Sequence, residues 1–436
     1  MNYKQVLLGK IADRTAIVAV AGLGYVGLPL AVEFAGAGFT VLGLDVDEDK
    51  VRTLNAGGSY IDDVPADSVS SLVAAGRQSA TGYYDDLRAA YAISICVPTP
   101  LRKTRDPDMS YISQAADSIA EICQPGMLIV LESTTYPGTT EEIILPEITR
   151  EQLKVGQEVF VAYSPERIDP GNRQYSVRNT PKVVGGITDS CTEVAQALYQ
   201  AAVDKIIGVS SPTAAEMVKL LENTFRAVNI GMVNEMALMC DKLDIDVWEV
   251  INAAATKPFG YMPFYPGPGL GGHCIPVDPH YLSWKLRTLD YNARFIELAS
   301  EVNAAMPLYV LDKITQALND QQKSVRGSQV LILGAAYKRD VDDVRESPAL
   351  DIISLLRQRG AEVAYCDPHV PELRLDPETL ISGADFSPAL LRSADCVVVV
   401  TDHSAFDWRE IAANSCVIVD TRHVYNSRDG DHIIGL

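Results

Sequence analysis

The chain has 436 residues, of which 47% are hydrophobic and 22% charged, a composition typical of globular proteins that bury a sizeable core. Its formal net charge of -20 at pH 7 argues against a surface that binds nucleic acid or an anionic membrane, and no run of about 18 apolar residues predicts a membrane span. The polar N-terminus lacks the apolar core of a secretory signal, and the eight cysteines form no C-x-x-C pair. We therefore expect a cytoplasmic protein with free thiols and no metal site.

The pattern of a dinucleotide-binding unit lies near the N-terminus. Residues 16–21 (AIVAVA) form a short apolar run, which predicts a buried parallel strand. The glycine-rich turn GLGYVG follows, then a helical pattern over residues 28–37 and a second apolar run over residues 39–44. Asp45 ends that run 18 residues beyond Gly27, close to the usual offset of about 20. Strand, glycine turn, helix, strand and acid in this order predict dinucleotide binding.

Each glycine of this turn has a separate expected role. Gly22 permits a tight turn, Gly24 lets the backbone approach the pyrophosphate, and Gly27 allows the helix to pack closely on the strand. The N-terminus of the helix faces the phosphates. Asp45 can accept hydrogen bonds from a ribose diol and repels a 2′-phosphate, so we expect NAD rather than NADP as the cofactor. The alternative is a turn required only for packing.

The remainder of this segment alternates strand-like and helix-like runs. Further strands are predicted over residues 92–97, 127–131 and 159–163. Such alternation predicts a doubly wound α/β domain, which we place over residues 1–210.

A helical segment follows, which we place over residues 211–320. Residues 212–243 keep helical periodicity throughout, and Thr213 with Glu216 three residues on matches a capping box. Further helical sequence is predicted over residues 247–255 and 279–318. A helix as long as the first one suits a domain connector or a dimer interface.

A polar stretch leads to a second α/β domain, which we place over residues 321–436. Its first predicted strand is followed by the turn GAAYK (residues 334–338), which lacks the three-glycine pattern, so we expect it to bind something other than the dinucleotide. The expected fold is therefore α/β, with two Rossmann-like doubly wound domains joined by a central helical domain that contains one long helix. The predicted strands of the last domain are residues 329–333, 362–366, 396–400 and 416–420, and its predicted helix is residues 348–358.

A second glycine-rich loop contains a candidate nucleophile. In PGPGLGGHCIPVD (residues 266–278), the glycines allow a ligand to approach backbone N–H groups, and the loop exposes the thiol of Cys274. Asp278 lies four residues further on, where its carboxylate can take part in the reaction of the thiol. The alternatives are an inert loop cysteine and a helix N-cap before Pro279.

The long predicted helix places several polar residues on one face. Glu216, Lys219, Asn223 and Arg226 follow one another at intervals of three or four residues. A lysine with an asparagine one turn away can hold a hydroxyl or an alkoxide. The alternative is an ordinary solvated helix face.

Polar residues also follow the ends of predicted strands, where the ligand sites of α/β sheets lie. In the first domain these are Thr99, Thr134, Glu166 and Arg167. In the last domain Lys338 and Arg345 flank the turn and can hold phosphates. The alternatives are a simple Ser-Pro turn before Glu166 and ion pairs between the two cations and their acidic neighbours.

Seven segments, in this order along the chain, resemble motifs of the UDP-glucose/GDP-mannose dehydrogenase family: GLGYVGLPLA, VPTPL, ESTTYPGT, YSPERIDPG, EMVKLLENTFRAVNI, GPGLGGHCIPVDP and GAAYKRDVDDVRESP. The resemblance covers about residues 15–425. It implies an NAD-dependent enzyme that oxidises the C6 hydroxyl of a UDP-sugar to a carboxylate through a cysteine thiohemiacetal and thioester.

The resemblance also implies roles for individual residues. Cys274 is the implied nucleophile, Lys219 and Asn223 contact the reacting C6 oxygen, and Asp278 assists water or proton transfer. Thr134 and Glu166 are implied in positioning water and in thioester hydrolysis. The implied cofactor contacts are Gly22, Gly24, Tyr25, Val26, Gly27, Asp45, Lys50, Thr99, Thr134 and Arg345. The implied substrate contacts are Glu166, Arg167, Lys219, Asn223, Tyr265, Gly271, Lys338 and Arg345.

The segments YSPERIDPGN and YPGPGLGGHCIPVDP resemble the branch that acts on UDP-N-acetylhexosamines, and within it the enzymes for UDP-N-acetylglucosamine most closely. Ile168 departs from the acidic residue expected in that branch, so UDP-glucose, UDP-N-acetylgalactosamine and UDP-N-acetylmannosamine stay open as substrates. The resemblance further implies a homodimer or larger homo-oligomer and a role in surface-polysaccharide synthesis, for instance of lipopolysaccharide O-antigen. The rival functions are an epimerase or simple alcohol dehydrogenase on the same scaffold, and a non-catalytic nucleotide sensor.

Overall fold

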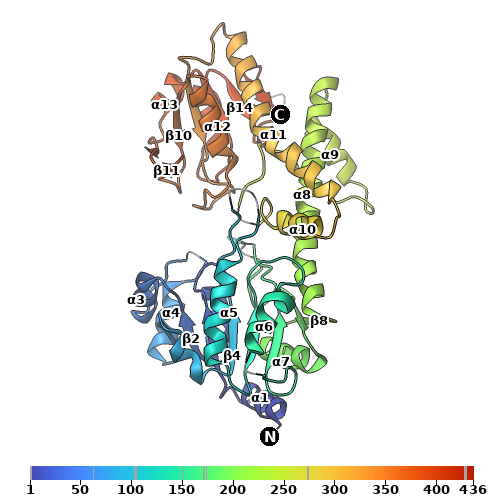
Figure 1. The fold of residues 1–436 in the computed structure, drawn as a ribbon. Helices are drawn as coiled ribbons and strands as arrows, with labels where there is room; N and C mark the ends of the chain where they lie inside the picture. The colour runs from blue at the N-terminus through green and yellow to red at the C-terminus, as the bar shows by residue number, and fades with distance from the viewer. Residues whose placement is uncertain are drawn as a thin grey trace. The chain divides into compact units, whose positions relative to one another are not determined.

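The computed structural model describes residues 2–61, 63–102, 106–150, 152–169, 172, 174–272, 274–426 and 430–436. Two compact units make up the chain (Figure 1). Unit 1 comprises Met1–Glu222 and His280–Asp290, and unit 2 comprises Asn223–Pro279 and Tyr291–Leu436. Among the described residues, no helix is both long enough and apolar enough to cross a membrane.

Unit 1 contains an eight-stranded sheet with the order β3-β2-β1-β4-β5-β6-β7-β8. Neighbouring strands run parallel except β6 and β7, which are antiparallel. The strands predicted for this part of the chain are confirmed, whereas β3, β7 and β8 are not predicted by the sequence pattern. The strands are β1 (Ile17–Ala21), β2 (Thr40–Leu44), β3 (Gln78–Thr81), β4 (Ala92–Ile95), β5 (Leu128–Leu131), β6 (Phe160–Tyr163), β7 (Lys182–Gly186) and β8 (Ile206–Val209).

Helices cover both faces of this sheet, because alternate residues of its strands point to opposite sides. Val18 and Val20 of β1 pack in one core with α1, α2 and α7, while Ala19 and Ala21 pack in a second core with α5 and α6. Burial on both faces explains why β1 is a continuous apolar run. The helices are α1 (Tyr3–Ala12), α2 (Gly27–Gly36), α3 (Glu48–Asn55), α4 (Ala66–Ala74), the 3₁₀ helix η1 (Tyr84–Ala89), α5 (Ser110–Ile122), the π-helical turn η2 (Thr140–Ile144), α6 (Leu145–Ile148) and α7 (Asp189–Gln200).

The predicted long helix is confirmed as α8 (Pro212–Leu243), drawn green in Figure 1, but its predicted capping box is wrong. Ser211 Oγ accepts the N–H of Ala214 (3.1 Å), so Ser211 and not Thr213 caps the helix. Pro212 at the first helical position favours this earlier start. Glu216 does not complete a cap, because its carboxylate binds the segment that follows β5.

Unit 2 contains a five-stranded parallel sheet with the order β10-β9-β13-β14-β15. Helices α11 and α12 pack side by side on one face (Figure 1), and α13 and α14 pack on the other. Strands β10 and β13 lie on either side of β9, so the carboxyl end of β9 is the switch point where α/β sheets bind ligands. The elements are β9 (Gln329–Leu333), α12 (Pro348–Gln358), β10 (Glu362–Cys366), the antiparallel pair β11 (Glu372–Arg374) and β12 (Leu380–Ser382), α13 (Pro388–Ser393), β13 (Cys396–Val399), α14 (Trp408–Asn414), β14 (Ile418–Asp420) and β15 (Ile433–Gly435).

The remaining helices are α9 (Val247–Ala255), α10 (Asp278–Arg287) and α11 (Arg294–Asp320). The single helical stretch predicted over residues 279–318 is wrong, because it is divided between α10 and α11. Asp290 in the break has a positive φ of 56°, a left-handed conformation that ends a helical run. The predicted fold class, two doubly wound α/β parts with a helical part that contains one long helix, is confirmed.

Candidate active site

The glycine turn after β1 leaves room for a ligand at one of its three glycines. A Cβ on Gly22, whose φ is +95°, would lie 2.5 Å from the carbonyl oxygen of Cys96, and one on Gly27 would lie 1.8 Å from the carbonyl oxygen of Gly22. These two glycines are therefore required by packing. A Cβ on Gly24 would meet nothing within 4 Å. This open backbone beside the start of α2, where Tyr25 and Val26 lie, fits the pyrophosphate of a dinucleotide.

Asp45 is held rigidly at the carboxyl end of β2. Its Oδ2 accepts the N–H of Leu23 (2.9 Å) and lies 3.3 Å from Nζ of Lys50, while its Oδ1 accepts the N–H of Asp47 (3.0 Å). The buried carboxylate is thus fixed beside the glycine turn, in the position from which an acid reaches a ribose diol.

Replacing Asp45 with Asn is expected to narrow the preference for NAD over NADP. The amide keeps an acceptor for the N–H of Leu23 but loses the charge that repels a 2′-phosphate and strengthens hydrogen bonds to the ribose. Hydrogen bonds to charged groups contribute about 1.5–3 kcal/mol, so the ratio of kcat/KM for NAD over NADP should fall by about 10- to 100-fold. Asp49→Asn, an exposed acid paired with Arg52, is the matched control. An unchanged ratio in Asp45→Asn would contradict this assignment.

Glu216 joins the first turns of α8 to the segment that follows β5. Its carboxylate accepts the N–H groups of Gly138 (2.6 Å) and Thr140 (2.9 Å) and the hydroxyl of Thr140 (2.7 Å). Burial raises the pKa of Glu216, and these hydrogen bonds oppose the rise. One turn further along α8, the largely buried Lys219 donates to the hydroxyl of Thr134 (2.6 Å). Two predicted site residues are thus brought together, and Lys219 is not on a solvated face.

Three other predicted residues of unit 1 lie at the same edge of the sheet. Thr99 follows β4, and its carbonyl accepts the hydroxyl of Tyr281 (2.7 Å). Glu166 follows β6, and its Oε1 accepts the N–H groups of Arg167 and Ile168, each at 2.7 Å. The guanidinium of Arg167 forms a fork with Glu222 of α8 (3.1 and 2.5 Å), so the structure gives it a partner within the protein.

Within unit 2, the chain around Cys274 meets α8. The carbonyl of the half-buried Cys274 accepts the N–H groups of Val277 (3.1 Å) and Asp278 (2.8 Å), which forms a turn into α10. Asp278 is buried, and its Oδ2 accepts Nδ2 of Asn223 (2.6 Å). Three predicted site residues therefore share one small region. His273, which precedes the cysteine, lies outside the described residues.

The glycine-rich loop before Cys274 lies directly on the turn that follows β9. A Cβ on Gly271 would lie 2.5 Å from Cβ of Tyr337, and the N–H of Gly272 donates to the carbonyl of Arg345 (2.9 Å). Lys338 adjoins Tyr337 in this turn. The guanidinium of Arg345 forms a fork with Asp343 (2.6–3.0 Å), so the ion pairing considered as the alternative for Arg345 is present.

The predicted residue Tyr265 and three residues that the sequence did not indicate, Trp248, Arg422 and His423, also border this loop. Tyr265 stacks on Trp248 (ring centroids 5.0 Å apart), and the same indole stacks on His423 (4.7 Å). A Cβ on Gly267 would lie 3.0 Å from Nη1 of Arg422, which follows β14. Arg422 follows the end of β14, and a cation at a strand end is the sequence feature that could have identified it.

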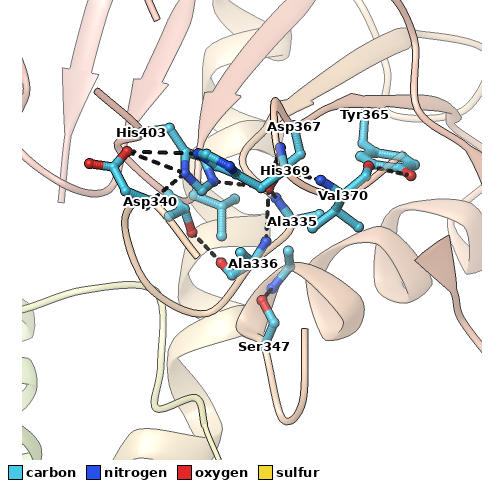
Figure 2. A network of polar contacts seen from close by, with 12 residues as sticks. Ala335, Ala336, Asp340, Ser347, Tyr365, Asp367, His369, Val370 and His403 are labelled. Atoms are coloured by element: carbon cyan, nitrogen blue, oxygen red, sulfur yellow. Dashed lines mark hydrogen bonds and ion pairs between the residues drawn. The ribbon is translucent and has the colours of Figure 1, made fainter. Parts of the chain in front are cut away.

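The switch point of the second sheet is filled by an acid of its own (Figure 2). Asp367 follows β10, and its Oδ2 accepts the N–H groups of Ala335 (2.6 Å) and Ala336 (3.0 Å) and lies 2.9 Å from Nε2 of His403. These N–H groups belong to the turn that corresponds to the glycine turn of unit 1. Because a carboxylate of the protein binds them, this turn does not offer them to a phosphate.

A cluster beside Asp367 has the composition of a metal site. Asp340, His369 and His403 each place one donor atom within 4.8 Å of the others (Figure 2). However, Nδ1 of His403 accepts the N–H of Asp340 (3.0 Å), and its Nε2 bonds to Asp367. Since both ring nitrogens already have partners, we assign no metal to this cluster and interpret it as a brace for the turn.

Replacing Asp367 with Asn is expected to destabilise the protein in a pH-dependent way. Burial opposes ionisation, but the hydrogen bonds from His403, Ala336 and His369 outweigh it and lower the pKa of Asp367 from 3.8 to about 2. Because the folded pKa is depressed, the stabilisation is present above about pH 4 and is lost as pH falls through 2. It amounts to about 2 kcal/mol at pH 7 and about half of that at pH 3. Thermal unfolding of both proteins at the two pH values tests this, and a pH-independent difference would refute it.

Each unit by itself holds side chains with the chemistry of an oxidation site. Unit 1 contributes a buried ammonium hydrogen-bonded to a threonine, and an anchored carboxylate at Glu166. Unit 2 contributes a thiol and an amide–carboxylate pair. A thiol can attack an aldehyde, ammonium and amide donors can stabilise oxyanions, and carboxylates can move protons.

Comparison with known proteins gives one family for the whole chain. The NAD binding domain of the UDP-glucose/GDP-mannose dehydrogenase family matches residues 16–203, its central domain residues 213–305 and its UDP binding domain residues 331–427. A UDP-N-acetyl-D-mannosamine dehydrogenase from Pyrococcus horikoshii is 34% identical over 415 residues, which cover 93% of this chain and 95% of the relative. An NDP-N-acetyl-D-galactosaminuronic acid dehydrogenase from Ralstonia nicotianae is 36% identical over 423 residues, which cover 94% and 96%.

Solved structures lead to the same conclusion. The structure of a UDP-D-ManNAc dehydrogenase from Pyrococcus horikoshii matches with a TM-score of 0.87 and 32% identity, covering 96% of this chain and 98% of that one. The protein is therefore an NAD-dependent nucleotide-sugar dehydrogenase, and it belongs to the UDP-glucose/GDP-mannose dehydrogenase family.

Proposed function

We propose that this enzyme oxidises the C6 hydroxyl of a UDP-N-acetylhexosamine to the carboxylate, with Cys274 as covalent nucleophile. The observation that carries the proposal is the arrangement along α8. Lys219 and Asn223 lie one turn apart, and each is hydrogen-bonded to another residue that the family resemblance implies in catalysis, Thr134 and Asp278 respectively. The three consecutive family matches support a division into NAD-binding, central and UDP-sugar-binding segments.

The net reaction removes four electrons from each sugar. Two NAD accept one hydride each, one water supplies the second carboxylate oxygen, and three protons are released. In unit 1, the open backbone at Gly24 and the carboxylate of Asp45 would hold the cofactor. In unit 2, Lys338 and Arg345 would hold the UDP moiety, beside a loop that includes Tyr265.

The residues of the chain act on the sugar in a fixed order. Lys219 and Asn223 donate hydrogen bonds to the C6 oxygen and stabilise it as charge develops. The sulfur of Cys274 forms a bond to C6 of the aldehyde, which gives a thiohemiacetal and then, after the second oxidation, a thioester. Glu166 takes a proton from the attacking water, which Thr134 helps to position, and Asp278 assists the proton transfers of the thiol. Hydrolysis breaks the carbon–sulfur bond and restores the thiol.

The comparisons change the order of the expected substrates. The motifs in the sequence favour UDP-N-acetylglucosamine, whereas the reported relatives are named for N-acetylmannosamine and N-acetylgalactosamine derivatives. We therefore place UDP-N-acetylmannosamine first, then UDP-N-acetylgalactosamine, and UDP-N-acetylglucosamine after them. Values of kcat/KM for these three sugars and UDP-glucose test the proposal. A UDP-N-acetylhexosamine should give the highest value, and activity with UDP-glucose alone would overturn the substrate class.

We also propose that the enzyme is a homodimer that pairs through α8. This helix exposes a row of apolar side chains at intervals of three, four or seven residues, which is typical of a helix face covered by a partner. Light scattering that returns the mass of a single chain would contradict the pairing. The exposed residues are Met217, Leu221, Phe225, Met232, Met236, Met239 and Leu243.

A further inference from the structure

A buried lysine lies at the edge of the unit 1 sheet that carries the proposed water-activating acid. Strand β7 is antiparallel to β6, with Tyr163 opposite Gly185. Extending this register by three residues places Glu166, which follows β6, opposite Lys182, the first residue of β7. The reversal of β7 therefore brings a cation to the edge at which the other strands end.

The ammonium of Lys182 makes two hydrogen bonds and a longer ion pair. It lies 2.7 Å from Oε2 of Glu132, 3.4 Å from the carbonyl oxygen of Pro165 and 3.9 Å from Oε2 of Glu166. Its Nζ also lies 5.0 Å from the ring centroid of Tyr199. The side chain is 6% exposed, so none of these contacts is a loose surface pair.

Glu132, which follows β5, binds the same ammonium. Its other oxygen accepts the hydroxyl of Tyr199, and the Glu132 side chain is fully buried. Burial raises the pKa of Glu132, and Lys182 opposes this rise. Burial alone would lower the pKa of Lys182, but Glu132 and Glu166 raise it, so the amine stays charged. The nearby thiol of Cys96 stays neutral, because burial raises its pKa well above the usual value.

Both oxygens of Glu166 therefore have a partner within the protein. Oε1 accepts the N–H groups of Arg167 and Ile168, and Oε2 faces Lys182. The neighbouring segment is braced in return, because the guanidinium of Arg167 donates to the carbonyl of Pro181 (2.5 Å), the residue before Lys182. Two buried carboxylates that share one cation would be unfavourable without these hydrogen bonds and ion pairs.

We infer that Lys182 is the positioning residue for Glu166 in thioester hydrolysis, with Glu132 and Tyr199 holding the lysine in place. This inference rests on the proposed function, in which Glu166 takes the proton of the attacking water. Lys182 contacts neither water nor sugar in this role; it fixes the orientation of the carboxylate and supplies the positive charge that faces it. Loss of Lys182 should therefore slow the last step of the reaction and leave the two oxidations intact.

The test is Lys182→Met, studied by rapid mixing of the full-length enzyme with NAD and the sugar that gives the highest kcat/KM. Misplacing a catalytic group by about 1 Å costs on the order of 100-fold, so the steady-state rate should fall by about that factor. The burst of NADH should keep its rate within about threefold, and intact mass should show the sugar acyl group on Cys274 accumulating. Lys182→Arg, which keeps the charge, should restore a large part of the steady-state rate. Lys4→Met, which removes a surface partner of Glu193 in the same unit, should change nothing.

Lys182→Met leaves Glu132 buried without its cation and so can fail to fold. The double variant Lys182→Met/Glu132→Gln removes both charges and keeps a hydrogen bond to Tyr199, and it should show the same acyl-enzyme accumulation. If a folded variant hydrolyses as fast as wild type, or loses burst and steady state together without any adduct, the inference is overturned. Failure of the proposed function itself is recognised separately, because the wild-type enzyme would then release one NADH per sugar.

Discussion

Replacing Cys274 with Ala is expected to reduce uronate formation by at least about 1000-fold, the largest effect we predict for any single substitution. Without the sulfur, the aldehyde has no nucleophile to form the thiohemiacetal, so the second oxidation loses its substrate. Uronate measured by chromatography after complete reaction, with NADH followed in parallel, checks this result.

The matched control for Cys274 is Cys416→Ser, since Cys416 is another cysteine of unit 2 but is exposed and remote in sequence from the proposed chemistry. It should retain wild-type turnover. Full uronate production by Cys274→Ala would remove the covalent intermediate from the mechanism.

Replacing Lys219 with Met is expected to lower kcat by about 100- to 1000-fold, the range found when one oxyanion donor is removed from an enzyme. Methionine has nearly the same length, so helix α8 should keep its packing while the ammonium that bonds Thr134 at 2.6 Å is lost. Because the interaction strengthens as charge develops on the C6 oxygen, KM should change much less than kcat.

Lys242→Met is the control for Lys219, because Lys242 belongs to the last turn of the same helix and is exposed. Its kinetics should match wild type. If Lys219→Met raised KM and left kcat unchanged, Lys219 would bind the substrate without assisting the reaction.

The sequence predicts those parts of the fold that depend on neighbouring residues. Strand β1, the glycine turn and Asp45 are recognisable because their spacing is local and each glycine is required sterically. Strand β3 (QSAT) is too polar to be recognised, and β7 and β8 contain glycines that weaken the strand pattern. The capping box at Thr213 fails for a different reason, since Glu216 bonds to residues 76–78 positions earlier in the chain.

The candidate site is likewise predictable only where its residues belong to a short motif. Cys274, Lys219 and Asn223 stand in motifs, so their residue types and spacing single them out. Lys182 begins a strand that carries no recognisable motif, and its partners Glu132 and Glu166 are 50 and 16 residues away. The antiparallel pairing of β6 with β7 brings Lys182 beside Glu166, and Glu132 follows β5, the other neighbour of β6. Pairing across a sheet is not encoded in any short segment, so the sequence alone does not identify this lysine.

The stoichiometry of NADH tests the central claim most directly. The wild-type enzyme, incubated to completion with excess NAD and a limiting amount of UDP-N-acetylmannosamine or UDP-N-acetylgalactosamine, should form two NADH per sugar consumed, with uronate as the product. One NADH per sugar with release of a free aldehyde would contradict the covalent four-electron mechanism, and consumption of sugar without net NADH would indicate an epimerase.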